Sequence, residues 1–510
     1  MQLIISSLLS CFHWQNLLGM VLGLGVGLFV GAMPGLSGVI GISLLLPFTF
    51  GMEPTMALLM LVGTYCGATY AGSISAILIK TPGTAAAAAT VLDGYQMNLK
   101  GRAQEALSVA LYASVFGGLF SGLVLLTVAP QLAKVALKFN SADYFMLAVF
   151  GLSVISAVGG KSICKGLVMA CFGVFASTIG IDPTEGVYRF TFGTITLSKG
   201  IALVPALIGL FAISELLNQT EKLFHAEKVE QSASASSKYG WKHMWRYKWT
   251  MLKSAVIGVV IGATPGTGAA IASFMAYGEA KRCSKHPEEY GHGCPEAVAA
   301  SESANNGVTG ATLIPMLTLG IPGDVITAVL MGALMIQGLN PGPQLFTQHA
   351  DMTYTVIVGF LIVNILMLYM GKLAIRAFGQ VCKVPYSVLL PVVLAFCLVG
   401  AYACSNSIYD CLIAIVFGVI GYLAEKFDFS TTPMLIGLVL GSLAEQNLIR
   451  TLTSSQGSLS VFVQRPISLL FIILTVLFVS YNLYTSKKSW NGRSVIIKSI
   501  LLSKKQEAPA

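Results

Sequence analysis

Charged residues are scarce in this chain. Of its 510 residues only 10% are Asp, Glu, Lys or Arg, whereas 55% are hydrophobic, and the mean hydropathy is +0.76. Soluble domains carry about 25% charged residues, so the composition excludes a soluble globular protein. We expect an all-α multi-pass membrane protein with about 12 transmembrane helices, some of them re-entrant or broken.

Motifs of catalysis and of metal binding are also missing. There is no HExxH pattern, Ser-His pair or Asp pair, and the histidines fall mostly between the apolar runs. Cys283, His286, His292 and Cys294 share one short segment, but their spacing fits no standard zinc pattern. GATPGTGA (262–269) lacks the Lys-Ser/Thr pair with which a phosphate loop holds a nucleotide and magnesium. The sequence therefore predicts no enzyme and no resident cofactor.

Patterns of secretion are absent as well. Most of the ten cysteines lie in apolar runs, where free Cys behaves as a small hydrophobe, so no disulfide framework is predicted. Residues 1–16 contain no Lys or Arg, and a cleaved signal peptide would begin with a basic segment. We expect the N-terminus to stay attached and to begin outside the cell.

The basic residues, which give a net charge of +9, gather in two places. One group lies within residues 221–253 and the other in the tail from Lys487 onward. Because cytoplasmic loops of membrane proteins carry an excess of Lys and Arg, both segments are predicted to be cytoplasmic.

An internal repeat underlies the apolar runs. GLFVGAMPGLSGVIG (27–41) resembles VVIGATPGTGAAIAS (259–273), and GATYAGSISAILIKTPGTA (67–85) resembles GATLIPMLTLGIPGDV (310–325). Two cytoplasmic basic segments separated by one repeat and one further span require an odd number of crossings per repeat, which makes the repeats inverted. The predicted division is a first repeat (15–218), a basic linker (219–250), a second repeat (251–448), a final helix (466–484) and a cytoplasmic tail (485–510).

Four Pro-Gly pairs interrupt these repeats. Proline removes a backbone donor, so each pair is expected to break a membrane helix and to expose the N-terminus of its second half. The free N–H groups and the positive dipole end there attract an anion. The alternative is a kinked helix whose small residues allow close packing. Segments 36–50 and 325–338, which follow two of the breaks, are too short to span a bilayer.

Polar residues inside the apolar runs are the other candidates. Glu302, Asn305 and Asn306 follow a run of alanines, and their oxygens could bind substrate or sodium, or could simply hydrogen-bond between helices. Lys80 precedes the second Pro-Gly pair, where it could contact substrate or extend its amine to the membrane interface. The stretch 93–95, Asp-Gly-Tyr, is predicted to be an ordinary turn.

With these motifs identified, the chain resembles the large membrane (permease) subunit of the tripartite tricarboxylate transporter family of bacteria. The resemblance covers roughly residues 15–485 and rests on GAMPGLSG, GTYCGATYAGSISAILIKTPGT with LDGYQM, IDPTEGVYRFTFG, GATPGTGAAIASFMAYGEAKR, SESANN, GATLIPMLTLGIPGD and GLNPGPQLF. Two positions depart from the family pattern. Lys80 stands where a neutral polar residue is expected, and Asp324 where a small residue such as Ser is usual.

The resemblance implies uptake of citrate-like di- or tricarboxylates across the bacterial inner membrane, coupled to Na⁺ or H⁺. It also implies a small membrane subunit and an extracytoplasmic solute-binding protein as partners; no nucleic acid is expected. The alternatives are a membrane-embedded enzyme, for which the catalytic motifs are missing, and an anion-selective channel. A channel would show a continuous polar stripe rather than duplicated helix breaks. The predicted substrate-binding residues are Pro34, Gly35, Ser37, Lys80, Pro82, Gly83, Thr84, Pro265, Gly266, Thr267, Asn305, Asn306, Pro322, Gly323 and Asp324.

Overall fold

The computed structural model describes residues 2–33, 36–158, 163–182, 186–223, 241–266, 268–381 and 386–480. These residues are overwhelmingly helical, and the strands among them are β1 (Gly180–Ile181) and β2 (Tyr188–Arg189), which pair antiparallel. Six described helices are long and apolar enough to cross a membrane: Trp14–Ala32, Pro54–Ile79, Ala103–Ala136, Leu203–Glu221, Ala350–Arg376 and Ile408–Lys426. The chain is therefore an all-α multi-pass membrane protein, as its composition predicts.

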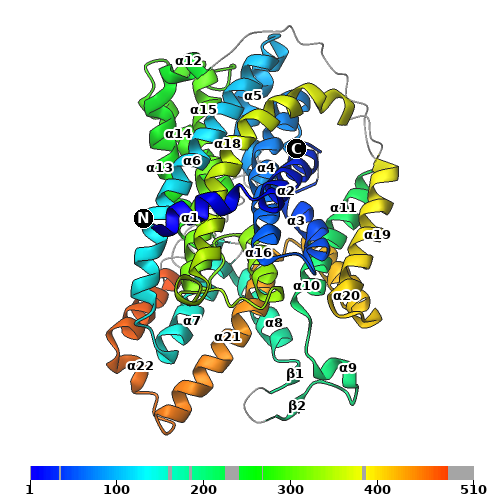
Figure 1. Ribbon diagram of the computed structural model, residues 1–510, viewed down its shortest axis with the longest axis vertical. Helices are drawn as coiled ribbons and strands as arrows, with labels where there is room; N and C mark the ends of the chain where they lie inside the picture. The colour runs from blue at the N-terminus through cyan, green and yellow to red at the C-terminus, as the bar shows by residue number, and fades with distance from the viewer. Residues whose placement is uncertain are drawn as a thin grey trace, which may run out of the picture. The chain divides into compact units, whose positions relative to one another are not determined.

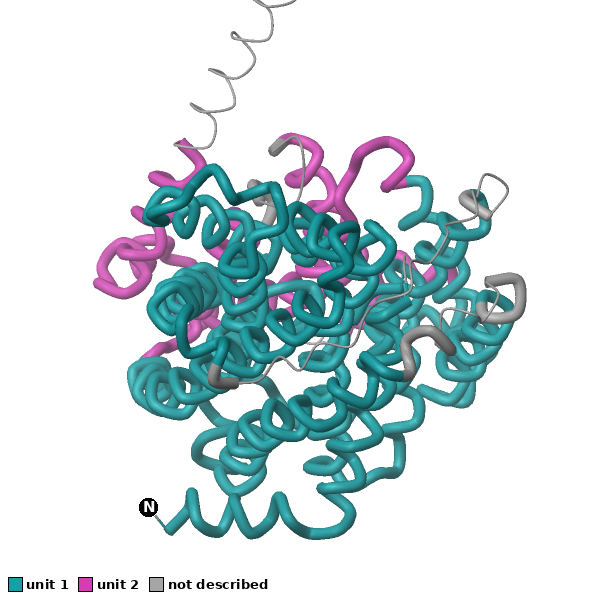
Figure 2. The backbone as a smooth tube through the Cα atoms, turned by 90° about the horizontal axis from the view of Figure 1, so that it is seen from above, with its two compact units in different colours: residues 1–138, 194–423 teal, residues 139–193, 424–510 magenta. Residues whose placement is uncertain are grey.

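The chain forms two compact units, coloured separately in Figure 2: residues 1–138 with 194–423, and residues 139–193 with 424–510. The helices of unit 1 are α1 (Gln2–Cys11), α2 (Trp14–Ala32), α3 (Gly38–Leu45), η1 (Leu46–Thr49), α4 (Pro54–Ile79), η2 (Ala85–Ala87), α5 (Ala88–Leu99), α6 (Ala103–Ala136), α9 (Ile195–Ser198), α10 (Leu203–Leu207), η3 (Ile208–Ile213), α11 (Ser214–Leu223), α12 (Trp241–Met244), η4 (Trp245–Tyr247), α13 (Lys248–Gly262), α14 (Gly268–Cys283), η5 (Pro287–Glu289), α15 (Pro295–Leu319), α16 (Val325–Ile336), α17 (Leu345–Gln348), α18 (Ala350–Val381), α19 (Tyr386–Ser405) and α20 (Ile408–Lys426), whose last turn belongs to unit 2.

Unit 2 contains α7 (Ser141–Val158), α8 (Ile163–Ser177), the two strands, α21 (Thr432–Ser454), α22 (Val461–Gln464) and a final helix, Pro466–Ser480. Helix α21 packs against both α7 and α8. An ion pair of 2.8 Å between Arg465 and the fully buried carboxylate of Asp143 joins the start of the final helix to the start of α7. This unit therefore brings together residues that lie 322 positions apart in the sequence.

Two helices of unit 1, α4 and α15, are buried along nearly their whole length. Both are rich in Gly, Ala, Ser and Thr, and small residues of this kind allow membrane helices to approach closely. Helix α15 is 25 residues long but is too polar to count among the six apolar spans, because it carries Glu302, Asn305 and Asn306. These polar side chains are tolerated because protein covers them on all sides.

Helix α2 packs on α4 through glycines. A Cβ atom built on Gly27 would lie 2.8 Å from the Cα atom of Thr64, and one built on Gly31 would lie 2.6 Å from the Cα atom of Ala68. Carbon atoms that are not bonded to each other do not approach so closely, so the two helices can pack at this distance only because these residues have no side chain.

Helix α13 packs on α15 in the same manner, and Figure 1 shows α13, α14 and α15 side by side. A Cβ atom built on Gly258 would lie 3.1 Å from the Cα atom of Ala304, and one built on Gly262 would lie 3.0 Å from that of Val308. Aligning the Pro-Gly motifs pairs these four residues with the four that join α2 to α4. Equivalent positions in the two halves thus make equivalent contacts.

Candidate functional site

The second Pro-Gly pair of the first half lies where the chain turns back along α4. Helix α4 ends at Ile79, and the N–H of Gly83 donates to the carbonyl of Gly72, 3.2 Å away. The Thr84 side chain then accepts a hydrogen bond from the N–H of Ala87 and caps η2, which leads into α5. The break therefore places a new helix start beside the last third of α4.

The second half repeats this arrangement on α15. That helix ends at Leu319, followed by Gly320 in the left-handed conformation at φ 69°. Gly323 packs on Thr312, because a Cβ atom built on it would lie 2.7 Å from the Thr312 Cα atom. Asp324 then caps α16. In the sequence alignment Gly323 and Thr312 are the equivalents of Gly83 and Gly72.

In each half a residue at or just before the first Pro-Gly pair lies against the second pair. In the second half the N–H of Gly266 donates to the carbonyl of Gly323 at 2.8 Å. In the first half the carbonyl oxygen of Gly31, just before the first break, lies against Gly83 and leaves no space for a Cβ atom there. Pro34, Gly35 and Thr267 lie outside the described residues.

Contacts across the two halves join the breaks further. The Tyr65 hydroxyl on α4 donates to Asp324 Oδ2 at 2.7 Å and lies 3.1 Å from Thr312 Oγ1 on α15. Asn305 Nδ2 on α15 donates to the carbonyl of Thr69 on α4 at 3.3 Å.

The helices that follow the breaks are paired across the halves as well. Helix α3 packs against α16, and α14 packs against η2. Ser37, half-buried, is the residue before the first turn of α3, and the next residue, Gly38, lies near both Ala68 and Ile326.

The contacts on α4 fall between Tyr65 and Gly72, which at 1.5 Å per residue is a length of about 10 Å. Those on α15 fall between Asn305 and Thr312. The structure thus gathers Ser37, Pro82, Gly83, Thr84, Pro265, Gly266, Asn305, Asn306, Pro322, Gly323 and Asp324 around two short stretches of buried helix. We call this set the break cluster.

Asp324 has a defined local role in the break cluster. Its Oδ1 accepts from the N–H and the hydroxyl of Thr327, at 2.7 Å each, while its Oδ2 accepts from Tyr65. The protein's own carboxyl group therefore occupies the N-terminus of α16, where the sequence predicts the anion of a substrate. Asp324 occupies one of the predicted anion positions.

Lys80 lies at the end of α4, two residues before Pro82 of this cluster. It adopts the left-handed conformation at φ 60° after the end of α4, and its side chain is exposed, with Nζ 5.7 Å from the centre of the Tyr95 ring. It stands eight residues beyond Gly72, or about 12 Å if the helical rise is applied. Its positive charge interacts favourably with the negative, C-terminal end of the α4 dipole.

Asp93 is a residue whose role the sequence reasoning missed. The prediction of a turn at 93–95 is wrong, because these residues lie within α5. Asp93 is buried and accepts hydrogen bonds of 2.8–2.9 Å from the N–H groups of Gly291, Gly293 and Cys294 and from the Tyr277 hydroxyl. One carboxylate thus anchors the segment between α14 and α15 to α5.

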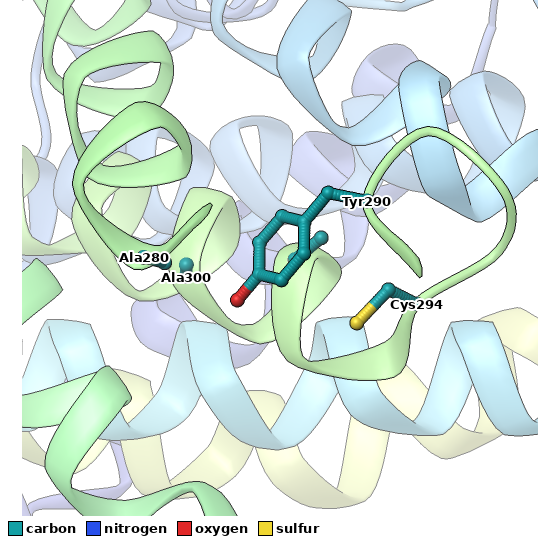
Figure 3. Close-up of a cluster of buried hydrophobic side chains, with 5 residues drawn as sticks. Ala280, Tyr290, Cys294 and Ala300 are labelled. Carbon is teal, nitrogen blue, oxygen red and sulfur yellow. The ribbon is translucent and has the colours of Figure 1, made fainter. Parts of the chain in front are cut away.

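The anchored segment packs on a small apolar cluster, drawn in Figure 3, where Tyr290 and Cys294 lie beside the alanines of α14 and α15. The cluster consists of Ala280, Tyr290, Cys294, Ala297 and Ala300. Burial raises the pKa of Tyr290 and that of Cys294, so both stay uncharged at neutral pH. Within the described residues no group of three or more His, Cys, Asp or Glu side chains could hold a metal ion.

Comparison of this sequence with known proteins shows the family to which the chain belongs. The model of the tripartite tricarboxylate transporter TctA family matches residues 17–436, most of the chain. The chain belongs to this family. It is thus a permease of the tricarboxylate transporter type, and the family is one of transporters rather than of enzymes.

Two relatives of this family member occur in Agrobacterium vitis. An uncharacterized 52.8 kDa protein in the TAR-I ttuC' 3' region is 36% identical over 457 residues, which are 89% of this chain and 90% of the relative. An uncharacterized protein in the TAR-II ttuC' 3' region is 37% identical over 204 residues, 40% of this chain and 84% of the relative. No solved structure matches the chain.

Proposed function

We propose that this permease imports di- and tricarboxylates, citrate-like anions, by secondary active transport coupled to Na⁺ or H⁺. The observation that carries the proposal is the convergence of the helix breaks of both halves on the stretches Tyr65–Gly72 and Asn305–Thr312. Broken helices that meet in a buried region are how secondary transporters present backbone groups to an ion or an anion.

In this proposal the carboxylates of the substrate bind to N–H groups at the breaks. Pro34-Gly35 with Ser37, Pro82-Gly83 with Thr84, and Pro265-Gly266 with Thr267 supply neutral donors, and Asn305 and Asn306 supply amides. Pro322-Gly323 completes the backbone around the site, while Asp324, already an anion, restricts how closely a substrate carboxylate approaches α16. Lys80 contributes from outside the cluster by attracting anions toward it.

We further propose that residues 15–218 and 251–448 are inverted repeats, joined by the cytoplasmic linker 219–250 and followed by a spanning helix at 466–484 and a cytoplasmic tail at 485–510. The equivalent glycine contacts of α2 with α4 and of α13 with α15 support this. Inversion places the two sets of breaks on opposite sides of the membrane midplane, which suits alternating access by movement of the break-bearing hairpins. The membrane is the bacterial inner membrane, with about 12 spans.

The partners that we propose are the small membrane subunit and the extracytoplasmic solute-binding protein of a tripartite transporter. Membership of the family supports this, since its members are large subunits of such systems. Delivery by a binding protein means that the permease need not itself hold free substrate tightly, and transport is expected only when that protein is supplied.

The test is uptake of labelled carboxylate by vesicles that contain the permease, its small subunit and the binding protein. Saturable accumulation against a concentration gradient, lost when the ion gradients are collapsed, is the expected result. Flux that follows only the electrochemical gradient of the anion would indicate a channel and would contradict the proposal.

A further inference from the structure

Glu302 is a fully buried carboxylate in the first third of α15. The Ser114 hydroxyl on α6 donates to its Oε2 at 3.1 Å, and the Thr90 hydroxyl on α5 donates to its Oε1. Ser73 on α4 and Asn305 on α15 also lie close to it. Three helices from the first half of the chain therefore enclose one acidic group from the second half.

No cation balances this carboxylate. Within the described residues no Lys, Arg or His nitrogen lies within 4.0 Å of it, and the groups that face it from α4, α5 and α6 are hydroxyls, the titratable one being Tyr70. Helices α13 and α14 cover a neighbouring face of α15 with an apolar cluster that includes Ala304 and Val308. An ionised carboxylate is strongly unfavourable in such surroundings unless a bound proton or metal cation neutralises it.

Oxygen atoms near Glu302 are also left without donors. Tyr70 Oη, Asn305 Oδ1 and Asn306 Oδ1 are buried and accept or donate no hydrogen bond within the described part of the chain. Buried polar atoms are satisfied in nearly all proteins, and oxygen atoms beside a carboxylate are the ligands that a small hard cation or a hydrated proton takes. The unbalanced carboxylate and the unpaired oxygens are two independent observations, and both indicate a small cation as the ligand.

Glu302 is connected to the break cluster through its own helix. Asn305, one turn further along α15, lies close to Glu302 and donates to the carbonyl of Thr69, within the α4 stretch on which the breaks converge. Asn306 donates to the backbone carbonyl of Glu302 at 3.3 Å. A change in the charge of Glu302 therefore acts on side chains at the substrate site.

We propose that Glu302 is the residue that binds the coupling ion, a monovalent cation that is either a proton or Na⁺. The helices around Glu302 then move through the membrane only when this carboxylate is neutralised. This inference rests on the proposed function, because it assigns the ion site of the same transporter. Occupied by the cation, the cage of α4, α5, α6 and α15 contains no net charge, and its movement through the low-dielectric interior costs less.

The experiment compares the wild-type transporter, Glu302→Gln and the control Glu296→Gln, each reconstituted with both partner proteins. Glu296 lies six residues earlier on α15, where its side chain is partly exposed and accepts from Thr250 at 2.5 Å. Two quantities are measured: accumulation driven by an imposed ion gradient, and exchange of labelled for unlabelled carboxylate without a gradient. We expect Glu302→Gln to lose accumulation and keep exchange, while the control keeps both.

The outcomes separate the two proposals. If wild type neither accumulates nor exchanges carboxylates, the proposed function fails. If wild type accumulates and Glu302→Gln accumulates equally well, the function stands and the assignment of Glu302 is overturned. Gradients of Na⁺ at fixed pH and of pH without Na⁺ identify the ion, and a wild type that responds to neither overturns the assignment.

A second variant covers the case in which Glu302→Gln does not insert. Glu302→Asp keeps the charge but withdraws it by one methylene from Thr90 and Ser114. Its half-saturating Na⁺ concentration, or the midpoint of its pH dependence, is expected to shift from that of wild type. Ion dependence that stays unchanged in this variant would overturn the proposal.

Discussion

Asp324 shows at the scale of one residue how helix capping and substrate binding compete for the same position. The helix start that the sequence assigns to a substrate anion is capped by this carboxylate, which Thr327 and Tyr65 hold from two sides. A small residue such as Ser, which the resemblance leads us to expect here, would cap the helix without a charge. The presence of Asp rather than a small residue at position 324 therefore affects which substrate carboxylate fits beside α16.

Replacing Asp324 tests this separation of charge and cap. Asp324→Ser keeps a capping oxygen and removes the charge, so we expect stability close to wild type and tighter binding of more highly charged carboxylates. Asp324→Ala removes both and is expected to cost about 1 kcal/mol more than the Ser variant. Thermal unfolding in detergent and competition by di- and tricarboxylates measure the two effects. Equal carboxylate preference in all three proteins would contradict the charge argument.

Asn305 and Asn306 test the role of buried amides. Hydrogen bonds between membrane helices average about 0.6 kcal/mol, so Asn305→Ala or Asn306→Ala should reduce protein abundance little. Transport should fall, because we place both amides at the substrate site. Normal abundance together with wild-type transport rate and affinity in both variants would show that they serve only as packing.

Lys80 calls for a different test, because it is exposed and outside the break cluster. Lys80→Gln should raise the half-saturating substrate concentration at low ionic strength, and the difference should shrink as salt is added, since screening acts over about 10 Å at 0.1 M. Lys80→Arg keeps the charge and should behave as wild type. An effect of Lys80→Gln that is independent of salt would instead indicate direct contact with substrate.

At the scale of whole elements, α4 and α15 are the scaffold on which the breaks are placed. Their neighbours α2 and α13 approach so closely that backbone touches backbone at several glycines. Dispersion contacts and close packing, rather than the hydrophobic effect, drive such association within a bilayer. The positions of the breaks therefore depend on these contacts.

Gly27→Ala tests the packing of α2 on α4. Its methyl group would be forced within 2.8 Å of the Thr64 Cα atom, so the helices must separate and the folded protein should become less abundant and less stable. Gly278→Ala is the matched control, because a Cβ atom there meets nothing within 4 Å and helical Ala is favoured over Gly. Equal stability of both variants would show that α2 and α4 tolerate separation.

At the scale of the whole molecule, the two halves are bound to each other by polar contacts as well as by packing. Asp93 of the first half holds the segment before α15, and Tyr65 holds the cap of α16. The linker and the tail, on which the predicted orientation depends, fall largely outside the described residues, at 224–240 and 481–510. The orientation of the linker and the tail relative to the membrane is therefore tested by chemical labelling.

Cysteines introduced at 221–250 and after Lys487, in a background without reactive native cysteines, test the orientation. We expect an impermeant thiol reagent to label them in inverted vesicles and not in intact cells, whereas one introduced near the N-terminus reacts from outside. Labelling of the central linker from outside intact cells would contradict the inverted repeats.

The sequence by itself determined the class of protein and the location of the helix breaks. The low content of charged residues indicates that the helices fold in a membrane. The breaks at Pro82-Gly83, Pro265-Gly266 and Pro322-Gly323 occur because proline has no N–H group to donate to the helix. Both properties depend on composition or on neighbouring residues, so they can be predicted without knowing which distant segments are in contact. The family followed from the same motifs and is confirmed by comparison.

Only the tertiary structure decided which side chains meet. Asp93 was predicted to lie in a turn because Asp and Gly favour turns, but packing holds the stretch in α5, and the carboxylate finds its donors some 200 residues away. Tyr65 meets Asp324 across 259 residues, and Glu302 is enclosed by hydroxyls from three helices of the other half. Side-chain partners so distant in the sequence leave no periodic or local signal, because they are set by how whole helices pack.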